Sequence, residues 1–190
     1  MLCYYTCGKY KRLPTHAPEA PQPKLLFSNL NYLADATGER RATKMENQHY
    51  AFILVSNEKH WNKLCERKRT GKETHVFVRK NLVAPVQTQK LLFYIKKPAM
   101  QIRGVADFIE RQTGNHEELW TKYGAESCFE NFDEYHAFAE GRQKMTFIRF
   151  KNLVELENTK PPETTTSILG SLRWFRGRYV DLETSKQLTT

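Results

Sequence analysis

Five short apolar runs, at residues 50–55, 76–80, 91–95, 102–109 and 146–150, constrain the fold of this chain more than any other feature. Each run has the length of a β-strand and is bounded by turn-forming or polar residues. The helical patterns between the runs are few and clustered, so they do not alternate with the strands as βαβ units require. We therefore predict an α+β fold, a small mixed β pseudobarrel with a helical insert.

The helical patterns begin at asparagines. Asn57, Asn115 and Asn131 each stand where an N-cap is expected, and the last two have a glutamate three residues later, as in a capping box. This pattern predicts one helix after Asn57 and a helical insert over residues 115–141. Gly104 interrupts the strand pattern of residues 102–109 and predicts a β-bulge there.

The periodic patterns do not cover the whole chain of 190 residues. Residues 1–48 are rich in proline and show poor periodicity, so we predict a poorly structured N-terminal extension. Residues 49–181 carry all the strand and helix patterns and form the predicted domain. Residues 182–190 are polar, and we expect a frayed tail.

Motifs for familiar chemistry are absent from the sequence. There is no apolar run of membrane-spanning length and no secretory leader, so we expect a cytoplasmic protein without a membrane partner. The cysteines Cys3, Cys7, Cys65 and Cys128 lack the paired spacing of a zinc site, which predicts free thiols and no metal. No phosphate-binding glycine loop occurs, so no cofactor is expected, and the six histidines are scattered singly, as at surface or capping positions.

The charge is unevenly distributed along the chain. Lys and Arg number 30 against 21 Asp and Glu, a formal net charge of +9. Residues 107–140 sum to −7, whereas residues 59–80 sum to +6 and residues 142–178 to +5. This separation predicts a basic face that contacts nucleic acid, with the acidic insert kept away from the ligand.

Aromatic residues alternate with cations in the second basic block. In a strand, Phe147, Arg149 and Lys151 would share one face, and the segment 172–179 repeats this chemistry around Trp174. A ring between cations can stack on a base while the cations contact phosphates. The same rings could equally be core residues, because large aromatics dominate protein interiors.

The run 50–56, which ends in a serine, and Trp61 on the following helix resemble the start of PUA-like domains, in particular the EVE and YTH groups. The runs 76–80, 91–95 and 102–106 are similar to the central strands of that superfamily. The stretch up to Tyr179 is also similar to a small, mostly archaeal PUA-like family of uncharacterised proteins. The resemblance implies a pseudobarrel that binds RNA or DNA, in some relatives by placing a modified base in an aromatic pocket.

Carried over by position, the resemblance puts Ser56, Asn57 and Trp61 at the mouth of such a pocket, with Tyr94 and Trp120 as further aromatic candidates. Trp61 also shares a helical face with apolar residues, so a core position is the alternative.

A second likeness concerns possible catalysis. The segment 71–79 loosely resembles the signature of ASCH domains, which are also PUA-like and include hydrolases. That likeness implies a catalytic Lys72 that activates Thr74 or a water. A solvated turn is the alternative interpretation.

The first hypothesis is a non-enzymatic PUA-like module that binds RNA or DNA and stacks a base on Trp61 or Trp174. The residues expected to contact its backbone are Arg79, Lys80, Arg103, Arg149, Lys151, Arg173 and Arg176. An ASCH-like hydrolase acting on modified nucleosides or RNA is the second hypothesis, with Lys72 and Thr74. A protein-interaction domain that docks a partner through the acidic helices is the third. The oligomeric state is left open.

Overall fold

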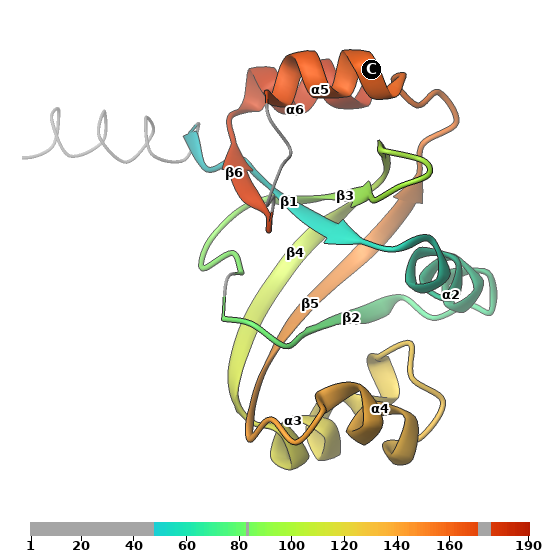
Figure 1. The fold of residues 1–190 in the computed structure, drawn as a ribbon, viewed down its shortest axis with the longest axis vertical. Coiled ribbons are helices and arrows are strands. Elements are labelled where there is room, and N and C mark those ends of the chain that lie inside the picture. The colour runs from blue at the N-terminus through green and yellow to red at the C-terminus, as the bar shows by residue number, and fades with distance from the viewer. Residues whose placement is uncertain (1–47, 83, 171–175) are drawn as a thin grey trace, which may run out of the picture. The chain divides into compact units, whose positions relative to one another are not determined.

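A strongly curved six-stranded sheet organises the computed structural model, which describes residues 48–82, 84–170 and 176–190 (Figure 1). The strands are β1 (Ala51–Ser56), β2 (Thr74–Arg79), β3 (Lys90–Ile95), β4 (Gln101–Asn115), β5 (Lys144–Glu155) and β6 (Arg178–Val180). Their order is β2-β5-β4-β3-β1-β6. Neighbouring strands are antiparallel except β1 and β3, which are parallel. The mixed α+β fold is confirmed.

The helices are α2 (Glu58–Arg69), α3 (His116–Tyr123), the 3-10 turn η1 (Gly124–Glu126), α4 (Phe132–Ala139), α5 (Pro162–Leu169) and α6 (Leu182–Thr189). Figure 1 shows α5 and α6 together at one end of the sheet and α3 and α4 at the other. None of the helices in the described part of the chain is long and apolar enough to cross a membrane.

Strands β1, β2 and β3 are buried along nearly their whole length because both of their faces are covered. In β1, Phe52 and Leu54 belong to one core cluster, whereas Ala51 and Ile53 belong to another that includes Leu169 of α5. Successive side chains of a strand point to opposite faces, so two covered faces require an unbroken apolar run. This is why the sequence shows runs rather than strict alternation.

The first of these clusters lies inside the curve of the sheet. It joins Phe77 of β2 with Leu54 of β1, although three strands (β5, β4 and β3) lie between these two in the sheet order. Phe93 of β3 and Phe150 of β5 belong to the same cluster. Trp61 of α2 completes it. The sheet therefore curls until its distant strands share one interior, which is the expected pseudobarrel.

The predicted helix starts are confirmed by their caps. The Asn57 side chain accepts a hydrogen bond from the His60 N–H at 2.7 Å, and the Asn131 side chain accepts one from the Glu134 N–H at 2.9 Å. Asn115 caps α3 in the same way. Each cap satisfies a backbone donor that the helix itself leaves without a partner.

The bulge expected near Gly104 is present, and helix packing explains why a glycine stands at this position. The register of β3 and β4 shifts between Phe93 and Tyr94, opposite Gly104. A Cβ atom at Gly104 would overlap the Trp61 ring. The absence of a side chain therefore lets α2 pack directly onto the sheet.

The expectation of a frayed tail is wrong. Residues 182–189 form α6, whose first turn is capped by Asp181 accepting from the Thr184 N–H at 2.7 Å. Leu188 is buried in the cluster that covers β1 and β3. The composition of this segment is mostly polar, so it does not reveal that one face of the helix is apolar and buried. The predicted extension, residues 1–48, lies outside the described residues apart from Gln48.

The thiol prediction is confirmed for the two cysteines that can be assessed. Cys65 and Cys128 are free and buried. Cys3 and Cys7 lie outside the described residues.

Candidate functional site

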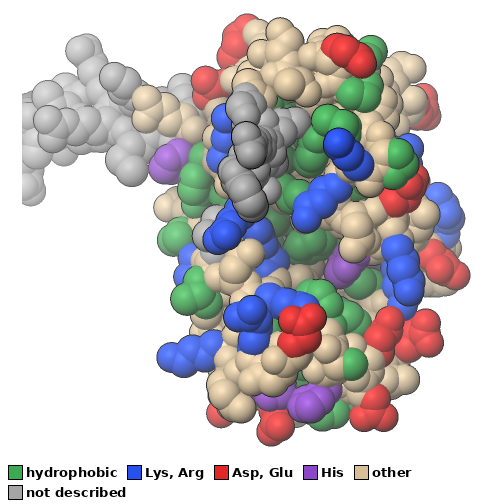
Figure 2. Space-filling view, in the orientation of Figure 1, with side chains coloured by type: hydrophobic (Ala, Val, Ile, Leu, Met, Phe, Trp, Pro, Cys, Tyr) green, Lys and Arg blue, Asp and Glu red, His purple; other side chains and the backbone are tan. Residues whose placement is uncertain are grey.

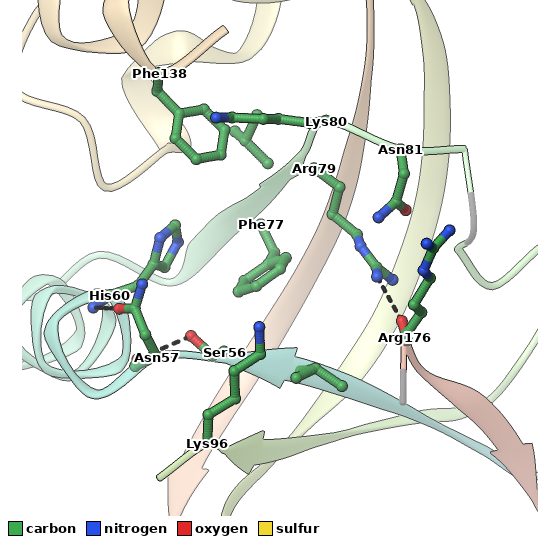
Figure 3. A pocket seen from close by; sticks show the side chains of 12 residues that line it. Ser56, Asn57, His60, Phe77, Arg79, Lys80, Asn81, Lys96, Phe138 and Arg176 are labelled. Carbon is green, nitrogen blue, oxygen red and sulfur yellow. Dashed lines mark hydrogen bonds between the residues drawn. The ribbon is translucent and has the colours of Figure 1, made fainter. Parts of the chain in front are cut away.

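A cavity of about 260 Å³ opens between the ends of β1 and β2 (Figure 3). The residues that line it come from six parts of the fold and are Val55, Ser56, Asn57, His60, Phe77, Val78, Arg79, Lys80, Asn81, Lys96, Phe138 and Arg176. The curl of the sheet explains their meeting, because it brings the end of edge strand β2 opposite the end of β1. In the orientation of Figure 1, basic side chains surround a hollow near the centre of the visible face (Figure 2).

One wall of the cavity is fixed by the turn from β1 into α2. The Ser56 hydroxyl donates to the Asn57 carbonyl at 3.1 Å, and the extended backbone of Asn57 leads into the helix it caps. This geometry directs His60, one turn into α2, towards the cavity (Figure 3). Lys96 joins the same wall because β3 runs parallel to β1, and the Lys96 N–H bonds the Ser56 carbonyl at 2.9 Å.

Arg79, the last residue of β2, carries a buried charge into the cavity. Only 7% of this residue is exposed. Its Nη2 donates to the Arg176 carbonyl at 2.5 Å, whereas its buried Nη1 has no hydrogen-bond partner among the described residues. Burial lowers the pKa of Arg79 to about 10, so the side chain stays protonated at neutral pH.

No carboxylate among the described residues forms an ion pair with Arg79. Buried charges are normally paired, because removing an ion from water is costly. A buried guanidinium with a donor to spare is therefore suited to an anion that comes from outside the protein.

The rest of the described lining is also cationic. Lys80, Lys96 and Arg176 join Arg79, and none of the described residues that line the cavity is acidic. Of these four cations, only Lys80 has an ion partner within the described part of the chain, Glu140 at 2.6 Å, and its ammonium also lies 4.6 Å from the centre of the Phe138 ring. The cavity thus concentrates positive charge over an apolar floor.

His60 and Cys128 form a neutral pair behind this wall. The His60 Nε2 lies 3.0 Å from the Cys128 Sγ. Burial lowers the pKa of His60 to about 4 and raises the pKa of Cys128 to about 11. At neutral pH the imidazole is uncharged and the thiol is protonated, so the pair does not supply the thiolate that nucleophilic catalysis needs.

Five of the residues predicted from the sequence meet at this cavity. They are Ser56, Asn57, Arg79, Lys80 and Arg176. The structure thus brings the end of the first strand, the end of the second strand and the start of the last strand to one place.

Trp61 does not line the cavity. It is 3% exposed and packs in the interior cluster, 5.3 Å from Phe93 between ring centres. The other proposed aromatic candidates are also elsewhere: Tyr94 is buried beneath α5 and α6, and Trp120 stacks on Tyr135 at 4.8 Å. The core alternative therefore holds for Trp61. Tyr94 is likewise buried, and Trp120 is partly buried against the cluster that includes Tyr135.

Arg149 is occupied within the protein. Its Nε and Nη2 donate to Glu126 at 2.7 Å, and its Nη1 donates to Glu110 at 2.6 Å. Arg103 likewise pairs with Glu58 at 3.2 Å. Neither guanidinium faces the cavity, so the expectation that these two residues contact a ligand backbone at this site is not supported.

The acidic insert forms ion pairs with residues of the first basic block, and its expected separation from the ligand stays a prediction. Glu134 of α4 binds Lys63 at 2.7 Å, and Glu140 binds Lys80. Phe147 of β5 is fully buried beneath the same insert. Much of the charge separated along the sequence is therefore paired in space, which a count along the chain cannot reveal.

The proposed catalytic residues Lys72 and Thr74 lie at the opposite end of β2 from the cavity. Thr74 pairs with Lys151 in the sheet, and five residue steps, roughly 17 Å of strand, separate it from Arg79. Lys72 is exposed in the preceding turn. Lys151 is also exposed and does not line the cavity. Arg173 and Trp174 lie outside the described residues.

Several lining residues were not singled out from the sequence: Phe77, Asn81, Lys96 and Phe138, as well as His60, which was assigned to the surface or to a cap. The parallel pairing of β1 and β3 is the signal that would have found Lys96, since parallel strands end at the same edge. No group of three His, Cys, Asp or Glu side chains in the described ranges is placed to hold a metal ion.

Comparison with solved structures supports the fold. A crystal structure of ASCH from Zymomonas mobilis matches with a TM-score of 0.58 and 17% sequence identity, covering 73% of this chain and 93% of that one. A point variant of the same protein gives a TM-score of 0.60 at 17% identity, covering 74% and 95%. At this identity the likeness concerns the fold alone.

Sequence comparison assigns the family. No curated protein matches the sequence. The family model described as a domain of unknown function, DUF365, matches residues 61–173. Because this match spans more than half of the chain and includes α2 and all the central strands from β2 to β5, the protein belongs to the DUF365 family.

Proposed function

We propose that this protein is a nucleic-acid-binding domain, with RNA as its first candidate ligand, and that the cavity between β1 and β2 holds part of the RNA backbone. The observation that carries the proposal is Arg79, a buried guanidinium with a free donor and no carboxylate partner among the described residues. Phosphate groups are the anions that nucleic acids present, and arginine binds them through two donors at once.

The surroundings of Arg79 support the same ligand. Lys96 and Arg176 extend the positive charge from the cavity to its exposed rim. A ligand with several phosphates could contact the buried and the exposed cations together, as a strand of RNA does. The net charge of +9 favours association with such a polyanion.

Salt-dependent binding tests the proposal directly. The affinity of the full chain for single-stranded RNA and DNA of one sequence is measured by fluorescence anisotropy at increasing salt. We expect the logarithm of the affinity to fall linearly with the logarithm of the salt concentration, by about 0.7 for each phosphate contact. Affinity that does not change with salt for any oligonucleotide would overturn the proposal.

Charge reversal at the cavity locates the binding. We expect Lys96→Glu and Arg176→Glu each to weaken binding at least tenfold. Lys186→Glu, at an exposed position of α6 outside the cavity lining, is the matched control and should bind like the unaltered protein. Equal losses in all three variants would show a diffuse effect of net charge instead of a site.

A hydrolase acting on modified nucleosides or RNA is the alternative suggested by the ASCH likeness. Lys72 and Thr74 lie away from the cavity, which gives this alternative less support. Product formation from acylated nucleosides or RNA, lost in Lys72→Ala, would favour it over a binding domain.

A further inference from the structure

Three features of the cavity describe its ligand more narrowly than nucleic acid: the number of unbalanced charges, the volume, and the few open aromatic faces among its described lining residues. This inference rests on the proposed function and concerns the same site.

The cavity has more positive charge than a single backbone phosphate can balance. Lys80 is paired with Glu140, but Arg79, Lys96 and Arg176 have no ion partner among the described residues. A phosphodiester within a strand carries one negative charge. A phosphate monoester carries about 1.5 to 2 at neutral pH, together with three strong acceptor oxygens. The monoester is the better match for this set of donors.

The volume favours a compact group. At about 260 Å³ the cavity is slightly smaller than the roughly 300–1,000 Å³ of most small-molecule sites. It can take a phosphate and the sugar attached to it, but not a run of nucleotides. Arg79 lines the cavity but is only 7% exposed, so a small terminal group is better suited to approach its guanidinium than a run of nucleotides.

The lining is poorly equipped to read a base. No tryptophan is among the described lining residues, and Phe77 is 5% exposed. The Lys80 ammonium already lies against the Phe138 ring. Base recognition normally uses an open aromatic face, and among the described lining residues neither Phe77 nor Phe138 offers one. The modified-base pocket implied by the EVE and YTH resemblance therefore has less support than a phosphate site.

The start of α2 adds to the attraction for an anion. Ser56 and Asn57 line the cavity at the N-terminal end of this 12-residue helix, where the helix dipole favours negative charge. The nearby carboxylate of Glu58 is held by Arg103 at 3.2 Å. His60 is uncharged at neutral pH, so it neither adds to nor opposes this field.

We propose that the cavity binds a terminal phosphate monoester, either the phosphorylated end of an RNA strand or the phosphate of a free nucleotide. Arg79 binds the phosphate oxygens through its free Nη1, and Lys96 and Arg176 balance the remaining charge from the rim. Nucleotides further along the strand contact the protein outside the cavity.

The test compares one oligoribonucleotide in three forms, with a 5′-phosphate, a 3′-phosphate, or hydroxyls at both ends. Affinities for the full chain are measured by calorimetry, with nucleoside monophosphates and inorganic phosphate as separate ligands. We expect one phosphorylated end to bind at least tenfold more tightly than the hydroxyl form. The preference should shrink below about pH 6, where the monoester gains a proton.

Variants assign the preference to the cavity. Arg79→Lys keeps the charge but loses the planar fork in which Nη2 binds the Arg176 carbonyl and Nη1 stays free, and we expect it to lose most of the preference for the phosphorylated end. Lys96→Gln and Arg176→Gln, at exposed positions, test the same point if Arg79→Lys does not fold. Lys186→Gln is the control and should retain the full preference.

The outcomes separate this inference from the proposed function. Equal, salt-dependent binding of all three oligonucleotides would overturn the terminal-phosphate site and leave the nucleic-acid domain intact. Binding of nucleoside monophosphates without binding of any oligonucleotide would keep the phosphate site and overturn the nucleic-acid function. Binding of none of these ligands would overturn both.

Discussion

Arg149 and Arg79 stand on paired strands of the same sheet, β5 and β2, yet they have opposite surroundings. Arg149 donates to two carboxylates, Glu126 and Glu110, whereas Arg79 donates to a single backbone carbonyl. The first arginine is held within a complete set of partners that belong to the protein. The second keeps a buried charge incompletely satisfied. A basic residue that is available to a ligand is identified by the absence of a carboxylate partner in the folded protein. The charge of its neighbours in the sequence does not identify it.

The cavity and the ion-paired carboxylates of the acidic insert should lose stability in different pH ranges. His60, at the cavity, has a pKa of about 4 in the folded protein against a usual 6.5. The unfolded chain therefore takes up a proton first, and the free energy of unfolding falls by about 3 kcal/mol as the pH drops from about 6.5 to about 4. Urea unfolding at a series of pH values measures this fall, and His60→Gln should remove it.

The ion pairs of Arg149 and Lys63 with carboxylates lose their stabilising contribution only at lower pH. Hydrogen bonds from Arg149 and Lys63 hold the pKa values of Glu110 and Glu134 below the usual 4.5. Their stabilising contribution is present above that value and is lost as the pH falls below it. A single transition, unchanged by His60→Gln, would contradict this separation of the two ranges.

Removing Arg149 should destabilise the protein. Arg149→Met leaves Glu126 and Glu110 close together without their cation. Because the Arg149 side chain is 23% exposed, we expect a loss of about 2 kcal/mol, less than for a fully buried pair. Chemical denaturation measures it. The affinity for RNA should stay the same, and a parallel loss of binding would show that the two regions are not independent.

Removing Arg79 should have the opposite effect on stability. Arg79→Met replaces a buried, incompletely satisfied charge with an apolar chain of similar length. We expect the free energy of unfolding without ligand to rise by about 1 kcal/mol, while phosphate and RNA binding are lost. A destabilisation as large as that of Arg149→Met would mean that Arg79 is structural and would remove the contrast on which the site rests.

The smallest effect is expected at Glu140, the ion partner of Lys80 at the cavity. Glu140→Gln breaks an exposed ion pair, so the free energy of unfolding should hardly change. The released Lys80 becomes available to the ligand, and we expect RNA to bind several-fold more tightly in calorimetry. Weaker binding would indicate that Glu140 holds Lys80 in the position that the ligand requires.

Local features of the fold could be predicted from the sequence because they depend on neighbouring residues. The asparagine caps at Asn57, Asn115 and Asn131 and the strand runs follow from spacing and side-chain chemistry over a few positions. Helix α6 was missed, since the burial of Leu188 depends on β1 and β3, which are distant in sequence. The likeness to EVE and YTH groups stays a prediction.

The site was predicted in part for the same reason. Ser56, Asn57, Arg79 and Lys80 stand at strand ends, a local property, and they meet at the cavity. Arg149 was chosen from a basic run, but Glu126 and Glu110 neutralise it from other elements. Charge counted along a chain ignores such partners, so it overstates the cations that are free to bind.

The pairing of β1 with β6 has a consequence for how the site forms. Ile53 pairs with Arg178, two residues beyond Arg176, so the cavity needs strands from opposite ends of the described chain. Contacts so distant in sequence form slowly, because a long loop must close before they stabilise anything. A chain that has folded only its β3–β4–β5 core would lack the site altogether. Ligand binding should therefore report completion of the fold. A ligand added during refolding should slow unfolding of the finished protein without speeding formation of the β3–β4–β5 core.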